Sequence, residues 1–436
     1  MSLTEKLFKV KERGSSTKTE FLGAVSAYLA VCYLFIVVPG MLADAGMPIG
    51  DATVATIWAA VLGTLMIAFI ANYPVVVAPG LGISAYFAYY VCGAMGLSWQ
   101  AACAAVVISG FVFFILTVTR VRQAIIKAIP LDLKLAIVAG IGAFITIIGL
   151  KNAGIVVATP SAMIGLGNRM QPQAYLTILG VVLAGWMMAK GIRLAMLITI
   201  LIVAALGIVT GVTPTDGIHN LFSGSFKIFP TETIFQVDFK QMLTVGIVGV
   251  LFSITMVDLF DNMSTLIGLS YRAGFMDKQG NIPSLDRALI SDSIATMGAG
   301  LIGTPTSTAI LESAVGIEAG ARTGLCALFL AGFALTLFVA PLLTLVPAFA
   351  TACVLIIVGY MMLQGTASRI NFSDITTGLP CFLTIFMMPF TFNIATGLAF
   401  GVISFVLLKL LAGKKEEITL TMAVLAVVFV GILISH

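Results

Sequence analysis

The sequence predicts an all-α, polytopic membrane protein with about fourteen membrane-spanning segments, arranged as a 7+7 inverted repeat. Of its 436 residues, 60% are hydrophobic and only 10% are charged, whereas soluble domains carry about 25% charged residues. The apolar runs are continuous over roughly 15 to 25 residues and do not alternate with polar residues, which argues against a β-barrel. The third and tenth runs are interrupted at corresponding places in the two halves.

Fifteen apolar segments can be marked along the chain. They cover residues 21–43, 52–72, 75–95, 98–119, 131–150, 174–190, 192–213, 241–270, 288–303, 308–320, 322–345, 347–364, 375–391, 394–411 and 418–434. Lys409, Lys414 and Lys415 favour the inner side of the membrane after 394–411, which leaves 418–434 as an odd pass. We therefore expect two of the last three segments to be short or to form a half-crossing pair, which gives fourteen in total.

The basic residues predict the orientation of the chain. Residues 1–20 are polar and basic and carry no small-residue cleavage site, so they read as a cytoplasmic tail and not as a signal peptide. Basic loops then recur on the same side, with Arg120, Arg122, Lys127, Lys134, Lys190, Arg193, Arg272, Lys278, Arg287 and Arg322. We expect a multi-pass protein of the cell inner (plasma) membrane with a cytoplasmic N-terminus. The net charge of +4 reflects this topology and does not indicate nucleic-acid binding.

Cysteine and histidine usage speaks against metal and disulfide chemistry. All six cysteines lie inside apolar segments without CxxC spacing, and we expect free, buried thiols. Neither His219 nor His436 lies in an apolar segment, so we expect no metal site, no cofactor and no histidine proton relay.

The two interrupted segments predict a binding site at the membrane midplane. Residues 75–85 contain a β-branched run broken by Pro79 and Gly80, and residues 303–308 contain Pro305 before a short helix. Matched interruptions of this kind are typical of inverted repeats with a central site, and non-helical backbone at that depth must line a cavity or be buried in protein. The alternative is that proline and glycine merely kink two ordinary helices.

Acidic residues inside apolar runs are costly and therefore candidates for function. Asp258 and Asp261 lie at positions i and i+3, on one helical face of the eighth segment. Both cannot ionise cheaply in a low dielectric, so one is expected to hold a proton, which would permit proton coupling. The alternative is that they cap or bridge nearby backbone groups. Asn262 and Asp292 are weaker, supporting candidates.

Glu312 follows the break in the tenth segment, where a half-helix would begin. Its carboxylate could accept two hydrogen bonds from a planar N–H ligand while neighbouring backbone N–H groups meet ring nitrogens or carbonyls, which suits a nucleobase. Alternatively, it only offsets the helix dipole. Phe260 could stack on a flat ligand, although such aromatics are more often packing residues. Glu318 and Arg322 are expected to pair in solvent.

Three strings resemble signature segments of the AzgA-like purine permeases, a branch of the nucleobase–cation symporter family, also called nucleobase–ascorbate transporters. They are VDLFDNMSTLIGL (257–269), GTPTSTAILESAVGIEAGARTGL (303–325) and APGLGISAYFAYY (78–90), and LKNAG (150–154) matches as well. The resemblance covers nearly the whole chain. It implies that Asp258, Asp261 and Glu312 bind substrate or couple protons, and that Gly82, Ile83, Ser84 and Thr308 line the site. Ser84 stands where the family commonly has Asn, which favours guanine and hypoxanthine over adenine.

The resemblance also implies a division into two domains. A core domain would comprise residues 21–119 and 241–345, and a gate domain residues 120–213 and 346–436, with a tail over 1–20 and an extracytoplasmic loop over 214–240. The expected function is proton-coupled purine uptake by alternating access, in a protein that associates with lipid and forms a homodimer, as related folds often do. Alternatives are an anion carrier of the sulfate or bicarbonate type, a membrane-embedded aspartyl enzyme, and a channel.

Overall fold

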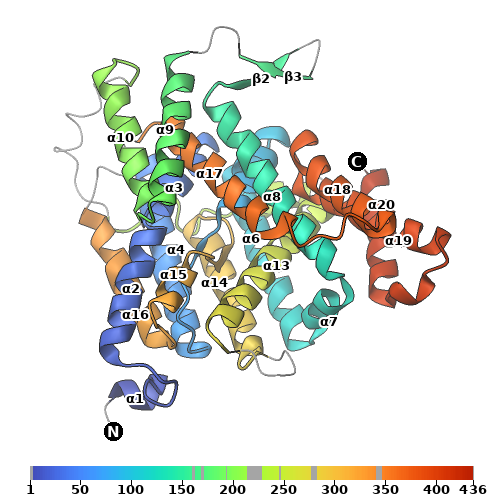
Figure 1. Ribbon diagram of the computed structural model, residues 1–436, viewed down its shortest axis with the longest axis horizontal. Helices are drawn as coiled ribbons and strands as arrows, with labels where there is room; N and C mark the ends of the chain where they lie inside the picture. The colour runs from blue at the N-terminus through green and yellow to red at the C-terminus, as the bar shows by residue number, and fades with distance from the viewer. Residues whose placement is uncertain are drawn as a thin grey trace.

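The computed structural model describes residues 3–159, 163–167, 171–192, 194–213, 228–244, 247–275, 282–339 and 346–435. It is a bundle of helices with two short strand pairs (Figure 1). Within these ranges, eight helices are long and apolar enough to cross a membrane, and five shorter apolar helices accompany them. The predicted all-α membrane fold is thereby confirmed.

The first half of the chain runs from α1 to α10. Its elements are α1 (Leu3–Phe8), α2 (Thr17–Val31), α3 (Leu34–Asp44), α4 (Ile49–Ile70), β1 (Val77–Pro79), α5 (Leu81–Ala85), the π-helix η1 (Tyr86–Ala94), α6 (Trp99–Val118), α7 (Val121–Ala128), α8 (Leu131–Asn152), β2 (Val156–Thr159), β3 (Met163–Leu166), α9 (Pro172–Ala189) and α10 (Ala195–Val209). The strands β2 and β3 form an antiparallel hairpin at one end of the bundle (Figure 1).

The second half runs from α12 to α20. Its elements are α12 (Phe239–Thr244), α13 (Ile247–Arg272), α14 (Leu285–Ile302), β4 (Ser307–Ala309), α15 (Ser313–Glu318), α16 (Gly324–Leu335), the 3₁₀ helix η2 (Thr336–Val339), α17 (Ala348–Ala367), α18 (Ile375–Phe390), α19 (Ile394–Leu411), the 3₁₀ turn η4 (Lys415–Glu417) and α20 (Leu420–Ser435). Asp374 and Asn393 begin α18 and α19 by accepting hydrogen bonds from backbone N–H groups of the first turn.

The two interrupted segments cross each other in the middle of the bundle. Strand β1 pairs antiparallel with β4, with Ala78 opposite Thr308. The β-branched residues before Pro79 favour extended backbone, and proline together with Gly80 prevents the helix from starting earlier. In the second half, Gly303 ends α14 with a φ of 101°, a value that glycine adopts without strain.

Helix packing repeats between the halves as an inverted repeat requires. Helix α4 of the first half corresponds to α14 of the second, and α6 corresponds to α16. Accordingly, α14 packs on α6, α4 packs on α16, and α4 and α14 pack on each other. In the same way, α8, α9 and α10 correspond to α17, α18 and α19. Helix α9 packs on α17 and α18 packs on α8; α10 packs on α9 and α19 packs on α18; and α8 and α17 pack on each other. Figure 1 shows α9 and α10 on one side and α18 and α19 on the other, with α8 and α17 between them. The pseudo-two-fold axis therefore passes through the strand crossing.

The repeat corrects one detail of the sequence comparison. The positions of the two breaks in the sequence match Pro79 with Pro305, but the strand register makes Ala78 the equivalent of Thr308, so Pro79 corresponds to Ala309. Pro305 lies before its strand, whereas Pro79 lies inside its own. The two prolines interrupt their helices at different places along the same structural motif.

Seven segments in each half take part in this repeat, and α20 is left over. Helices α18 and α20 have 16 residues each, or about 24 Å at 1.5 Å per residue, which is shorter than a hydrocarbon core of about 30 Å. Two of the last three segments are thus short helices, and whether they cross the membrane stays a prediction. They are separate helices, and α20 packs on α19 and α7.

The N-terminal residues, expected as a tail, are folded against the bundle. Phe8 and Val10 are buried in a small cluster with Ala68 and Leu325. The buried carboxylate of Glu20 accepts hydrogen bonds from the backbone N–H groups of Arg322 and Thr323 at 2.9 and 3.3 Å. These contacts attach the segment to both halves.

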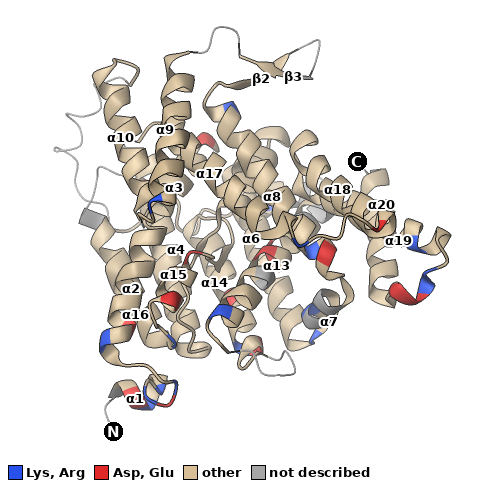
Figure 2. Cartoon of the chain, viewed as in Figure 1, with Lys and Arg blue, Asp and Glu red and all other residues tan. Residues whose placement is uncertain are grey.

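Charged residues are sparse within the bundle and gather near α1 and beyond the end of α19 (Figure 2). The predicted pairing of Glu318 with Arg322 was wrong. Glu318 bonds Arg272 at 2.7 Å, and the Arg322 guanidinium donates to the carbonyls of Ile317 and Ala321 instead. Arg122, expected in a basic loop, is fully buried. The six cysteines are free as predicted; Cys92 is half-buried and the others are buried.

Candidate substrate site at the strand crossing

Two short helices begin where the strands cross. Helix α5 starts after Gly80 and continues into η1, and α15 starts after Glu312. The Ser84 N–H donates to the Gly80 carbonyl at 2.9 Å, so the N–H groups of Leu81, Gly82 and Ile83 precede the first bond within α5. A helix start of this kind presents backbone donors and partial positive charge to a ligand.

Glu312 is half-buried at the start of α15, as the sequence predicts. Its carboxylate accepts a hydrogen bond from the hydroxyl of Tyr33, which lies between α2 and α3. A tyrosine donor fixes the orientation of the carboxylate and leaves its remaining lone pairs for a ligand. Tyr33 was missed from the sequence, because a tyrosine within an apolar run looks like a packing residue.

Asp261 lies against the crossing itself. A methyl group built at Gly80 would lie 2.7 Å from Thr308 Oγ1 and 3.4 Å from Asp261 Oδ2. Thr308 is buried, and its hydroxyl has no hydrogen-bond partner among the described residues. Only a glycine at position 80 permits this close approach of β1, β4 and α13. Asp261 is half-buried and has Glu312 and Asp292 among its electrostatic neighbours.

Asn262 supports the crossing from α13. Its Oδ1 accepts a hydrogen bond from the backbone N–H of Ala309 at 3.2 Å, which ties β4 to the helix that carries the two aspartates. A buried backbone donor in an interrupted segment needs such a partner.

Asp258 is fully buried. Neither of its carboxylate oxygens has a partner at hydrogen-bonding geometry among the described residues, and the Thr306 hydroxyl, which also lacks one, lies within interaction range. Its charged neighbours are Asp292, Arg122 and Asp261. Asp292, on α14, bonds Arg122 through Oδ2 at 3.0 Å. The structure thus places both predicted aspartates near Asp292 and adds a guanidinium that the sequence analysis had assigned to a loop.

The remaining predicted residues lie deeper in the protein. Gly82 faces α8, where a methyl group would lie 2.6 Å from Ile141 Cγ2. Ile83 and Ser84 are buried, and the Ser84 hydroxyl has no hydrogen-bond partner among the described residues. Phe260 is 5% exposed, so it offers little free ring surface in this conformation.

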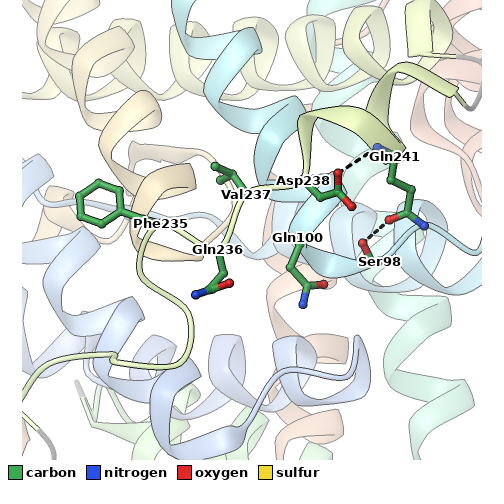
Figure 3. Close-up of a pocket in the computed structure, with 7 residues that line it drawn as sticks. All are labelled: Ser98, Gln100, Phe235, Gln236, Val237, Asp238 and Gln241. Carbon is green, nitrogen blue, oxygen red and sulfur yellow. Dashed lines mark hydrogen bonds between the residues drawn. The ribbon is translucent and has the colours of Figure 1, made fainter.

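A separate cavity of about 530 Å³ lies away from this crossing (Figure 3). It is bordered by residues that precede and begin α12 and by the start of α6, namely Ser98, Gln100, Phe235, Gln236, Val237, Asp238 and Gln241. Ser98 donates to the Gln241 side chain, and the Gln241 N–H donates to Asp238 at 2.9 Å. None of the predicted site residues lines this cavity.

Crossed half-segments, an open helix start at α5 and carboxylates at the centre of an inverted repeat define a multi-pass membrane carrier. The profile of the Permease family matches residues 18–400, and the chain belongs to this family. Its members are permeases, so the protein is a transporter and not an enzyme.

Three relatives match along nearly the whole chain. A putative permease of Methanocaldococcus jannaschii is 38% identical, covering 98% of both chains. The adenine permease AdeP of Escherichia coli is 36% identical over 98% of this chain and 95% of its own. The guanine/hypoxanthine permease PbuO of Bacillus subtilis is 37% identical over 97% and 98%. These matches confirm the resemblance to purine permeases.

The fold is shared with a solved transporter structure. The transmembrane domain of the cyanobacterial bicarbonate transporter BicA superposes with a TM-score of 0.63, at 16% identity, over 88% of this chain and 97% of its own. At this identity the likeness concerns the fold alone.

Proposed function

We propose that this permease imports purine nucleobases, guanine and hypoxanthine before adenine, together with protons by alternating access. The observation that carries the proposal is the half-buried Glu312 carboxylate, oriented by Tyr33 at the crossing of the two interrupted segments. Relatives that carry adenine and relatives that carry guanine and hypoxanthine are similar to the chain at 36% and 37% identity. Identity therefore supports purine uptake without ranking the bases, and the serine at position 84 favours the 6-oxopurines.

Glu312 is suited to hold the N–H edge of a base. Its carboxylate can accept from two adjacent N–H groups, while the N–H groups at the start of α5 can donate to a carbonyl or ring nitrogen. Hydrogen bonds to a charged group contribute about 1.5–3 kcal/mol each, and a base lacking the matching edge would leave the lone pairs of Glu312 that Tyr33 does not use without a donor.

Proton coupling is assigned to the aspartates of α13. Asp258 has no hydrogen-bond partner among the described residues and lies close to other carboxylates. Burying an unpaired ionised carboxylate is costly, so proton uptake there would favour a loaded, neutral site. Asp261 has both Asp292 and Glu312 as electrostatic neighbours, so in this proposal it links the proton site to the bound base.

The two domains expected from the sequence supply the moving parts. The Gly82 backbone on α5 contacts Ile141 on α8, and η1 bonds α8 through Tyr89 and Asn152. In our proposal α8 belongs to the gate, and α5 and η1 belong to the core that carries the site. Sliding of the core against α8 would expose the crossing alternately to the two sides.

We further propose an inner-membrane location with a cytoplasmic N-terminus, and a homodimer. The basic loops on the N-terminal side support this orientation. Cysteines introduced at Glu12 and in the β2–β3 hairpin, labelled from each side of the membrane, test the orientation. The anion-carrier alternative is not favoured, because the relatives similar in sequence are nucleobase permeases and a carboxylate stands at the helix start.

The test is uptake of radiolabelled hypoxanthine by cells that lack their own purine carriers. We expect uptake that guanine competes, that a protonophore abolishes, and that Glu312→Gln reduces by about tenfold or more. Glu318→Gln is the matched control, because Glu318 lies on the same short helix in an exposed ion pair with Arg272. Uptake that is indifferent both to the protonophore and to Glu312→Gln contradicts the proposal.

A further inference from the structure

Arg122 is a buried cation to which the transport cycle proposed above gives no role. Its side chain is 0% exposed and is the largest fully buried one in the part of the chain that the structure describes. It belongs to the first turn of α7. This helix begins directly after Arg120, whose φ of 60° turns the chain sharply at the end of α6. This turn directs the guanidinium into the bundle, although the sequence places it between two apolar segments like an ordinary loop charge.

The guanidinium is held by three contacts. Nη2 donates to Asp292 Oδ2 at 3.0 Å, Nη1 donates to the Leu289 carbonyl at 3.4 Å, and the group lies 4.6 Å from the centre of the Phe113 ring. Its Nε and the Oδ1 of Asp292 have no hydrogen-bond partner among the described residues. The pair is therefore bonded through one carboxylate oxygen only; Arg122 Nε keeps a free donor, and the Asn262 side-chain amide is a further neighbour of Asp292.

The charges around Arg122 do not balance. One guanidinium faces two fully or nearly fully buried carboxylates, Asp292 and Asp258, and Asp261 is a further charged neighbour of Asp258 from the same helix. Glu312 is an electrostatic neighbour of Asp261. Arg122 can neutralise one of the two buried carboxylates, and a single proton neutralises the other.

We propose that Arg122 is a positioning residue of proton coupling, which bonds Asp292 while Asp258 carries the proton and is drawn toward Asp258 when that proton leaves. This inference rests on the proton-coupled transport proposed above. The unpaired Nε and the two unpaired Asp258 oxygens are the atoms that would form the second arrangement. If Nε bonds Asp258 while Nη2 stays on Asp292, the guanidinium fork gives each ionised carboxylate a donor, and the group then carries one net negative charge.

The position of α7 gives this exchange a mechanical consequence. Helix α7 packs on α6 and α13, and only two residues, Ile129 and Pro130, separate it from α8. Arg122 is thus the point where the segment leading into the proposed gate is attached to the helices that carry the coupling aspartates. A change in its partner would shift α7 and with it the start of α8.

The experiment uses the full-length protein in liposomes, with three measurements on each variant. They are hypoxanthine binding, hypoxanthine exchange without a pH gradient, and hypoxanthine accumulation driven by an imposed pH gradient over a range of pH. For Arg122→Gln we expect binding and exchange near those of the wild type, but accumulation lower by about tenfold or more and a flat pH profile. Arg122→Lys, which keeps the charge without the fork, is expected to recover part of the accumulation.

Arg120→Gln is the matched control, since Arg120 is exposed and two residues away. If Arg122→Gln does not fold, the double variant Arg122→Gln/Asp292→Asn removes both charges of the pair, and we expect it to fold, exchange and not accumulate. Accumulation with the wild-type pH profile in either variant overturns the inference, and so does failure of both to fold, which would assign the pair to folding. A wild type that ignores the gradient would instead refute the proposed proton coupling itself.

Discussion

The hydroxyl of Tyr89 accepts a hydrogen bond from the side-chain amide of Asn152 at 2.8 Å and donates one to Asp44 Oδ2, also at 2.8 Å. Tyr89 lies on η1 and Asp44 ends α3, whereas Asn152 ends α8. The ammonium of Lys151, beside Asn152, lies 6.0 Å from the Tyr89 ring centre and 5.2 Å from that of Phe392. A polar contact therefore joins the proposed core to the proposed gate on one side of the crossing.

Linking these two positions covalently should stop transport. We expect that Tyr89→Cys/Asn152→Cys, joined by a short bifunctional thiol reagent, loses hypoxanthine uptake, because the core can then no longer separate from α8. A pair within the gate, Asp132→Cys/Asn371→Cys, is the control, since the Asn371 N–H bonds Asp132 at 2.7 Å. The parent protein with its six native cysteines receives the same treatment. Full uptake by the linked Tyr89/Asn152 pair would show that these elements do not separate during transport.

Tyr33→Phe should weaken substrate binding without unfolding the protein. The variant keeps the ring and removes only the hydroxyl that donates to Glu312. Losing a hydrogen bond to a charged group costs about 1.5–3 kcal/mol, so we expect the KM for hypoxanthine to rise by about tenfold or more. Tyr28→Phe is the control, because that hydroxyl lies 3.4 Å from Thr336 at an exposed position. An unchanged KM in Tyr33→Phe would mean that Glu312 needs no fixed orientation.

Gly80→Ala should disrupt the crossing. The added methyl group would lie 2.7 Å from Thr308 Oγ1, and overpacking of this kind costs about 1–3 kcal/mol. We expect a clear fall in uptake that Gly80→Ala/Thr308→Ala partly restores, because the second change removes the atom that is struck. Gly298→Ala on α14 meets nothing within 4 Å and should leave uptake unchanged. No recovery in the double variant would place the defect in the backbone of β1 and not in this contact.

Asp374 should stabilise the protein in a pH-dependent manner. The Thr376 hydroxyl that donates to it and the neighbouring Lys414 ammonium lower the pKa of the Asp374 carboxyl from its ordinary value. A carboxyl with a lowered pKa contributes stability above its unfolded-state pKa of about 3.9 and loses that contribution as the pH falls toward its folded-state value.

We therefore expect Asp374→Asn to lower the Tm at pH 7, and the gap between variant and wild type to narrow at pH 3. Lys414→Met, which removes one partner of Asp374 at 3.0 Å, should lower the Tm at pH 7 by less than Asp374→Asn does. An equal difference in Tm at both pH values would assign the effect to the hydrogen bonds that Asp374 makes at the start of α18 and not to its charge.

The sequence predicted those parts of the fold and site that depend on local signals. Proline, glycine and β-branched residues in an apolar run located both interrupted segments, and an isolated carboxylate after the second break located Glu312. Tyr33 and Arg122 could not be found in this way, because their partners lie 279 and 170 residues away in the chain. Nothing near Arg122 in sequence distinguishes it from Arg120, whose side chain is exposed.

The register of the repeat was beyond sequence reasoning for a related reason. Matching the two prolines assumed that equivalent breaks use the same residue at the same place. The pairing of Ala78 with Thr308 shows that the halves keep the backbone path and have exchanged the residues that interrupt the helix.

Antiparallel pairing of β1 with β4 has a consequence for how a cargo molecule is oriented. The two paired strands are related by the pseudo-two-fold axis, so the strand pairing by itself cannot tell one end of a flat molecule from the other. The side chains can, because the chain supplies an acceptor, Glu312, beside one helix start and places Gly80 with bare amide donors beside the other. Differences between the two halves at these few positions are enough to give the binding site two chemically distinct ends. A bound base is then held in one orientation.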